Sequence, residues 1–206
     1  MRKTFELFAR LLSERLAAKV TTSEDSIRCT FFYALLSSTA YRHTEVIVEN
    51  PHPQFKEKKI DFLITPRDDE VSIAIEFKYD RTIPSGQSIN KTNRAGMFFN
   101  DLLRLAQLPR ATASRRFFVY VTDSQMASYF RNPNNGFVSL FDLPMGKELQ
   151  VDRAFFDGRP ISFKAKVSCD FIPFKAISFY ACDIGKEHLV RVWEIETLNF
   201  FPFKFR

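Results

Sequence analysis

Two stretches in the first half of the chain alternate apolar and polar residues with the period of a β-strand. Residues 59–64 read KIDFLI, and residues 71–78 read VSIAIEFK. Because successive side chains of a strand point to opposite faces, Glu76 and Lys78 share the polar face of the second stretch. Asp61 lies on the polar face of the first stretch. The apolar face of the first stretch comprises Ile60, Phe62 and Ile64.

The polar residues 67–70 between these stretches are few enough to form a hairpin loop. The pairs expected from that loop are Pro66 with Val71, Ile64 with Ile73, Phe62 with Ile75, and Ile60 with Phe77. Asp61 then lies directly across from Glu76, at about 5 Å. Two carboxylates in that position repel each other, so we expect a cation at the same place. Lys78 is one candidate for that cation, and a divalent metal such as Mg²⁺ is the other.

The segments around the hairpin predict further helices and strands. Ser23 is a typical N-cap for the apolar run 27–36, with Glu24 and Asp25 in the first helical turn. The other expected helices are 3–19, 89–105 and the short run 124–130. The apolar face of the first comprises Phe5, Phe8, Ala9, Leu12 and Leu16. The apolar stripe of the second comprises Met97, Phe98, Leu102, Leu105 and Leu108. The other expected strands are 43–51, 116–122, 137–141, 161–168, 176–182 and 188–195.

An aspartate on one strand followed by Glu-x-Lys on the next resembles the PD-(D/E)XK nuclease superfamily. The resemblance covers residues 20–123, about half of the chain, and Ile60 stands where the family has its namesake proline. It implies an α/β (α+β) protein with a restriction-endonuclease-like αβββαβ core, in which helices flank a mixed central sheet. We expect residues 1–131 to form this core with an added N-terminal helix. Residues 132–206, after the turn-rich segment 131–136, are expected to form a β-rich extension packed on it within one compact domain.

The same resemblance implies the site residues. Asp61, Glu76 and Lys78 are the expected catalytic residues, and Mg²⁺, with Mn²⁺ as a substitute, is the expected cofactor. Its expected ligands are Asp61, Glu76 and the backbone carbonyl of Phe77, with Glu24 as a further ligand. The alternative for Glu24 is a purely structural role in the first turn of its helix. The alternative for the hairpin as a whole is a surface element with ordinary charges.

Basic residues close to the hairpin are candidates for nucleic-acid binding. Lys91 and Arg94 begin a predicted helix, where positive charge is unfavourable unless a partner such as a phosphate is present, although a solvated helix end explains them equally well. Arg81 follows the second strand and is a third candidate.

Other polar residues are assigned structural or surface roles. Glu45 and Glu49 share a strand face that we expect to be solvated, although one of them could approach the metal. Asp101 is expected to pair with Arg104, three residues further along the helix. His43 and His52 are expected at the surface, where phosphate contact is a further option.

Composition agrees with a nucleic-acid partner without requiring one. The chain has 206 residues, with 30 basic and 24 acidic side chains and a net charge of +6. Cys29, Cys169 and Cys182 are odd in number and lack C-x-x-C spacing, which favours a reducing compartment and argues against a zinc site. The absence of a signal peptide pattern and of a long apolar run predicts a cytoplasmic protein. Most of the 24 phenylalanines are expected in the core, although those among basic residues at 200–206 could stack on bases.

These observations predict a metal-dependent deoxyribonuclease that cuts endonucleolytically. Three alternatives stay open. The first is a sequence-specific type II restriction enzyme, often a homodimer. The second is a nuclease-like fold that binds nucleic acid or a protein without cutting. The third is an enzyme acting on RNA or on a nucleotide.

Overall fold

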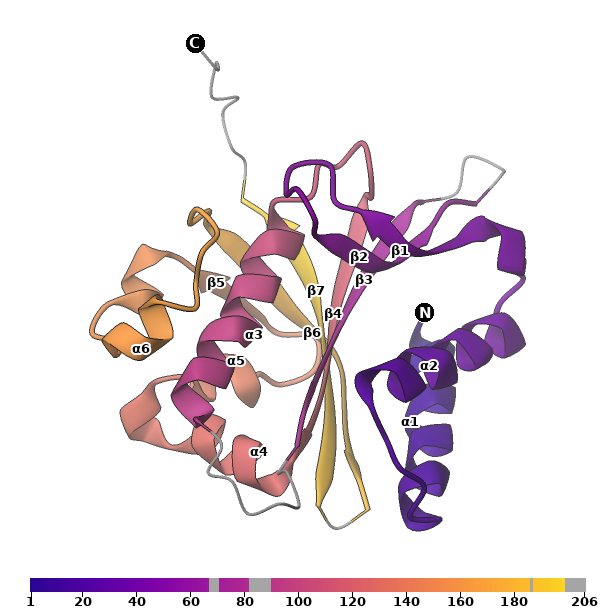
Figure 1. Ribbon diagram of the computed structural model, residues 1–206, viewed down its shortest axis with the longest axis horizontal. Helices are drawn as coiled ribbons and strands as arrows, with labels where there is room; N and C mark the ends of the chain where they lie inside the picture. The colour runs from indigo at the N-terminus through magenta and orange to yellow at the C-terminus, as the bar shows by residue number, and fades with distance from the viewer. Residues whose placement is uncertain (67–70, 82–89, 186, 199–206) are drawn as a thin grey trace.

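The computed structural model describes residues 1–66, 71–81, 90–185 and 187–198, and these form a mixed seven-stranded sheet with helices on both faces (Figure 1). Its strand order is β1-β2-β3-β4-β7-β6-β5. The strands are β1 Val46–Pro51, β2 Lys59–Ile64, β3 Ile73–Asp80, β4 Arg115–Asp123, β5 Glu148–Val151, β6 Phe174–Ile184 and β7 His188–Thr197. The helices are α1 Arg2–Ala17, α2 Glu24–Ser38, α3 Lys91–Ala106, α4 Ser124–Arg131, α5 Val138–Phe141 and α6 Ile161–Lys164. Among the strand pairs of the described residues, only β3 and β4 pair in parallel, because α3 crosses over between them.

The order α2-β1-β2-β3-α3-β4 is the predicted αβββαβ order, and the α/β class with a mixed sheet is confirmed. Strands β6 and β7 contain the predicted strands 176–182 and 188–195. β7 pairs with β4, so the C-terminal strands continue the same sheet. Among the described residues, no helix is long and apolar enough to cross a membrane.

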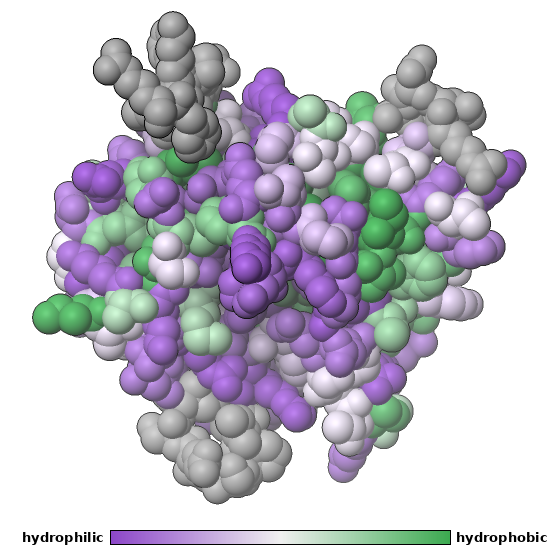
Figure 2. All heavy atoms as spheres, turned by 45° about the horizontal axis from the view of Figure 1, so that its top comes forward, coloured by the Kyte–Doolittle hydropathy of each residue, from purple (hydrophilic) through white to green (hydrophobic). Residues whose placement is uncertain are grey.

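Two hydrophobic layers hold the sheet between the helices. Helices α1 and α2 cover one face, and α3 to α6 cover the other (Figure 1). On the first face, the ring of Phe31 lies 5.0 Å from that of Phe77 and 5.6 Å from that of Phe5. On the second face, Phe98 and Phe99 of α3 are fully buried among other aromatic rings. Figure 2 shows polar residues over most of the face that it presents, with smaller apolar areas between them.

The register predicted for the hairpin is confirmed at Phe62 with Ile75 and at Ile64 with Ile73, whereas the predicted pairs Pro66 with Val71 and Ile60 with Phe77 are not part of the described ladder. β2 and β3 pair through Phe62↔Ile75, Leu63↔Ala74 and Ile64↔Ile73. The predicted loop 67–70 lies outside the described residues. Ile60 does not share a face with Phe62 and Ile64 as predicted, because it packs with the α3 layer. The β1–β2 pairing is interrupted next to it, at Glu49, whose φ of +54° breaks the regular alternation of the pair.

Several predicted elements are wrong in type or extent. The predicted strands 137–141 and 161–168 are the short helices α5 and α6, and the short strand β5 was not predicted. Periodicity does not separate strand from helix in short aromatic runs, and tertiary packing decides. Residues His43–Glu45 form a 3-10 turn before β1 begins. Met97 is 40% exposed, so it does not belong to the buried stripe of α3.

Gly96 explains how α6 packs against α3. A Cβ atom at Gly96 would lie 2.6 Å from the backbone carbonyl oxygen of Phe163 in α6. Such a distance is a clash with backbone, so this crossing requires glycine. The close approach also brings the buried Phe163 ring to 5.6 Å from that of Phe99.

Replacing Phe31 by alanine should lower the free energy of unfolding by about 3–5 kcal/mol, because it empties the centre of the aromatic layer under α2. Tyr33 lies on the same helix, is 63% exposed, and provides a matched control. Tyr33→Ala should change the stability by no more than about 0.5 kcal/mol. Urea unfolding of the two variants beside the wild type measures both values. Equal losses for the two variants would contradict the packing described here.

Candidate active site

The candidate site lies where β2 and β3 stop pairing, beyond Phe62 and Ile75, and we call this place the strand fork. The main-chain ladder between the two strands ends at Phe62↔Ile75, whereas β3 stays paired with β4 as far as Asp80↔Thr122. One edge of β3 therefore has no strand partner beyond Ile75 among the described residues. A buried main-chain N–H needs an acceptor, so something other than a strand must supply it.

Two carboxylates supply these acceptors. The N–H of Phe77 donates to Oδ2 of Asp61 at 2.7 Å, and the N–H of Tyr79 donates to Oε2 of Glu24 at 3.0 Å. The N–H and C=O of one strand residue point to the same side, so the carbonyl of Phe77 opens into the fork beside Asp61. The fork therefore gathers Asp61, Glu24 and the Phe77 carbonyl.

Glu76 is the most deeply buried acidic group of the fork. Its side chain is 4% exposed, and its Oε1 accepts from Nη2 of Arg104 at 3.0 Å. Burial raises the pKa of Glu76 well above its ordinary value. The positive charge of Arg104 opposes this rise in the pKa, and the negative charge of Asp61 adds to it.

Asp61 lies against Glu76, as the register predicts. Its Oδ1 accepts from Nη1 of Arg28 at 2.9 Å. Burial raises the pKa of Asp61, while the Phe77 N–H, Arg28 and a hydrogen bond from Glu76 act in the opposite direction. Burial is thus the main cause of the raised pKa of both carboxyl groups, because it disfavours their charged forms.

The cations beside the carboxyl pair are two arginines, which the sequence did not point to. Arg28 lies one helical turn after Glu24 on α2, and its guanidinium also contacts Asp25 and, at 3.7 Å, Glu49. The four-residue spacing from Glu24 was a signal that could have placed Arg28 on the same helix face. The contact from Arg104 to Glu76 requires the packing of α3 on the sheet, which no local pattern reveals.

Lys78 lies on the same strand face as Glu76 but has a different partner. Its Nζ is 3.1 Å from Oδ2 of Asp101, and its side chain is 16% exposed. Burial lowers the pKa of Lys78, but Asp101 and Glu24 outweigh it and the pKa is raised overall. The ammonium group therefore stays charged near neutral pH. The predicted pair between Asp101 and Arg104 is confirmed at 2.7 Å.

Ion pairs continue along β3 toward its end. Asp80 is 1% exposed and accepts from Nη1 of Arg94 at 2.6 Å and from the hydroxyl of Tyr120 at 3.0 Å. Arg94, predicted to bind nucleic acid, is thus engaged with a buried carboxylate. Lys91 begins α3 and is half-buried. Arg81 lies over the ring of Tyr79, with its Cζ 5.9 Å from the ring centroid.

The remaining candidates lie at the margin of the fork or outside it. Glu49 pairs with Lys59 at 2.6 Å, whereas Glu45 accepts from the N–H of Arg42 at 2.8 Å. The prediction that His52 lies at the surface is wrong. It is 6% exposed, and its Nε2 lies 3.2 Å from the carbonyl oxygen of Arg104. His43 is exposed, as predicted.

The oxygen atoms at the fork supply some of the ligands that a hard divalent cation needs. Two carboxyl groups in contact and a main-chain carbonyl are the oxygen ligands that Mg²⁺ takes, with water completing its shell. Across the part of the chain that the structure describes, no group of three or more His, Cys, Asp or Glu side chains has the geometry of a metal site. The three cysteines form no disulfide. A cation at the fork would therefore rest on Asp61, Glu76 and the Phe77 carbonyl, with Glu24 near by.

Comparisons of the chain with protein-family models, with curated proteins and with solved structures found no match.

Stability should depend on pH through Glu76. Its pKa is raised above the ordinary value of 4.5, so the folded protein holds this proton more tightly than the unfolded chain does. Relative to Glu76→Gln, the wild type should lose unfolding free energy as the pH rises above that value, and the two should not diverge below it. Urea unfolding across a pH series measures this difference.

Glu148→Gln is the control for this pH series, because Glu148 lies on β5 with its side chain 60% exposed and pairs only with Lys175 among the described ion pairs. Its pH dependence should match that of the wild type. Parallel pH profiles for Glu76→Gln and the wild type would contradict a raised pKa at Glu76.

Proposed function

We propose that this protein is a metal-dependent nuclease that hydrolyses phosphodiester bonds in DNA, with the strand fork as its active site. The observation that carries the proposal is the meeting of the carboxyl groups of Asp61 and Glu76 at an open sheet edge. Lys78 lies on the same face of β3, two residues further on. The αβββαβ order of the elements around the fork supports the resemblance to the PD-(D/E)XK nucleases.

The residues of the fork divide the chemistry between them. Asp61, Glu76 and the Phe77 carbonyl are the groups that would hold Mg²⁺ or Mn²⁺, and Glu24 is placed to orient them. When bound, the cation would lower the pKa of a water molecule and take up negative charge from the phosphate. Arg28 and Arg104 keep both carboxyl groups aimed into the fork.

The charged state of the Lys78 side chain favours a role in stabilising charge over a role as a base. The Nζ of Lys78 forms an ion pair with Asp101 at 3.1 Å, which favours its charged form, whereas a lysine that removes a proton from water must first lose its own proton. A charged ammonium group instead stabilises the additional negative charge of the phosphate as the bond breaks. We therefore assign Lys78 to charge stabilisation and to holding the water in place.

A second candidate function rests on the two arginines. Arg28 and Arg104 already neutralise Asp61 and Glu76, so the carboxyl pair could serve as a permanent scaffold of a fold that binds nucleic acid without cutting it. Metal binding separates the two candidates, because a scaffold of this kind has no need of a cation.

Mg²⁺ should raise the melting temperature of the wild type, and the rise should be larger at about pH 8 than at about pH 5, because the cation competes with the proton held by the carboxyl pair. Asp61→Asn should abolish the rise, and Glu148→Gln should leave it unchanged. Scanning calorimetry with and without Mg²⁺ measures these values. A wild-type melting temperature that Mg²⁺ does not change at either pH would favour the scaffold.

Supercoiled and linear DNA should be cut in the presence of Mg²⁺ or Mn²⁺ and left intact in EDTA. Asp61→Asn and Lys78→Met should each slow cutting by about 10²-fold or more, since each removes an interaction with the reacting phosphate or its metal. Glu148→Gln is the matched control and should cut at the wild-type rate. Gel electrophoresis of the time courses measures the rates.

The same gels separate the remaining alternatives. A discrete band pattern would indicate a type II restriction enzyme, and faster cutting of a matched RNA would indicate a ribonuclease. No cutting by a folded wild type, with unchanged DNA binding in all variants, would reject the nuclease proposal.

A further inference from the structure

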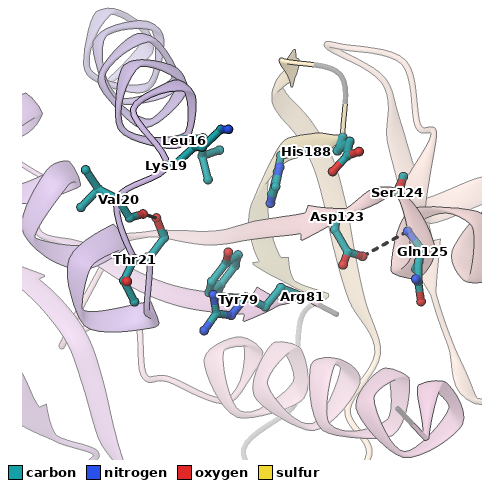
Figure 3. A pocket seen from close by; sticks show the side chains of 12 residues that line it. Leu16, Lys19, Val20, Thr21, Tyr79, Arg81, Asp123, Ser124, Gln125 and His188 are labelled. Atoms are coloured by element: carbon teal, nitrogen blue, oxygen red, sulfur yellow. Dashed lines mark hydrogen bonds between the residues drawn. The ribbon is translucent and has the colours of Figure 1, made fainter. Parts of the chain in front are cut away.

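A pocket of about 570 Å³ lies next to the strand fork, on the side where β3 and β4 end and β7 begins (Figure 3). Its walls come from Tyr79 near the end of β3, Arg81 after β3, Asp123 at the end of β4, His188 at the start of β7, and Lys19 and Thr21 between α1 and α2. Figure 3 shows the side chains of Tyr79, Asp123 and His188 converging on one space from three strands.

Tyr79 joins the pocket to the fork. Its main-chain N–H is held by Glu24 within the fork, while its ring lines the pocket. Successive side chains of a strand point to opposite faces, so the Tyr79 ring lies on the α1–α2 face of β3 and Lys78 lies on the α3 face. A polymer whose phosphate occupies the fork would reach the pocket across the sheet edge at Glu24.

The walls present flat surfaces. The Arg81 guanidinium lies 5.9 Å from the centroid of the Tyr79 ring, and the imidazole of His188 comes from another wall. Aromatic rings and guanidinium planes are the surfaces on which unpaired bases stack. The volume lies within the range of pockets that take small ligands and leaves room for one nucleoside.

The charges of the pocket balance. Lys19 and Arg81 are opposed by Asp123 and Glu187. Burial lowers the pKa of His188, although Asp123 and Glu187 act in the opposite direction, so the imidazole is neutral near pH 7. Asp123 also accepts hydrogen bonds from the N–H groups of Gln125 and Met126, and it thereby caps the start of α4. A balanced pocket suits an uncharged polar ring better than a phosphate.

On the basis of the proposed function, we infer that this pocket binds an unpaired base next to the phosphate in the fork. A base within a continuous duplex is stacked and paired, and it cannot enter a pocket without being extruded. The substrate class that follows is DNA with a single-stranded segment or end.

The test is binding of short fluorescein-labelled DNA in EDTA, measured by anisotropy, so that cutting plays no part. The wild type should bind a single strand more tightly than the matched duplex. Tyr79→Leu and Arg81→Gln should each weaken single-strand binding about tenfold. Tyr33→Leu is the matched control, because Tyr33 is 63% exposed on α2 and does not line the pocket, and it should bind as the wild type does.

Two results would overturn the inference. One is wild-type affinity for the single strand in both Tyr79→Leu and Arg81→Gln, with melting curves that show both to be folded. The other is duplex binding by the wild type that is as tight as single-strand binding.

The test of the pocket and the test of the nuclease proposal can fail independently of each other. Metal-dependent cutting that Tyr79→Leu leaves unchanged on single strands and duplexes alike would keep the nuclease and reject the pocket. Single-strand binding that depends on Tyr79 and Arg81, in a protein that never cuts, would keep the pocket and reject the nuclease.

Discussion

The arrangement of this molecule depends on the main-chain N–H groups on the open edge of β3. Beyond Ile75 this edge is no longer paired with β2, yet Phe77 is only 3% exposed, so its N–H needs an acceptor other than water. Asp61 and Glu24 supply acceptors from β2 and from the first turn of α2. This requirement ties α2 to the sheet, turns Asp61 toward Glu76, and leaves the Phe77 carbonyl facing the opening. The cation site that we propose is thus a by-product of how the chain satisfies its backbone.

The interface between β3 and α3 changes from apolar to charged along its length. Ala74 packs under buried α3 side chains, whereas the next three residues on that face are Glu76, Lys78 and Asp80, each paired with a residue of α3. Buried ion pairs add little net stability compared with apolar packing, because desolvation offsets their attraction. A chain selected only for stability would have continued the apolar packing. The charged half of the interface therefore favours a role in binding or chemistry.

The hairpin could be predicted because its signals are local. Alternation and the length of the polar stretch place Asp61 opposite Glu76, and a capping pattern places Glu24 at the start of α2. Arg28 and Arg104 could not be placed in this way, because each reaches its carboxylate only through the packing of a helix on the sheet. The short aromatic runs that form α5 and α6 were wrongly predicted as strands for a related reason, since burial against α3 decides their conformation. His52 is buried by its contact with the carbonyl of Arg104, which lies 52 residues away along the chain.

The pairing of β4 with β7 has a consequence for how the protein is made. β4 lies between β3 and β7, and its partner on one side comes from residues 188–197, well after β4 itself has left the ribosome. Until β7 is synthesised, a nascent chain that has already assembled the fork carries a long, apolar and unpaired strand edge. Such edges template association with other chains, and pairings distant in sequence form slowly. The interval between the two strands is thus the stage of biogenesis at which a chaperone would matter most for this protein.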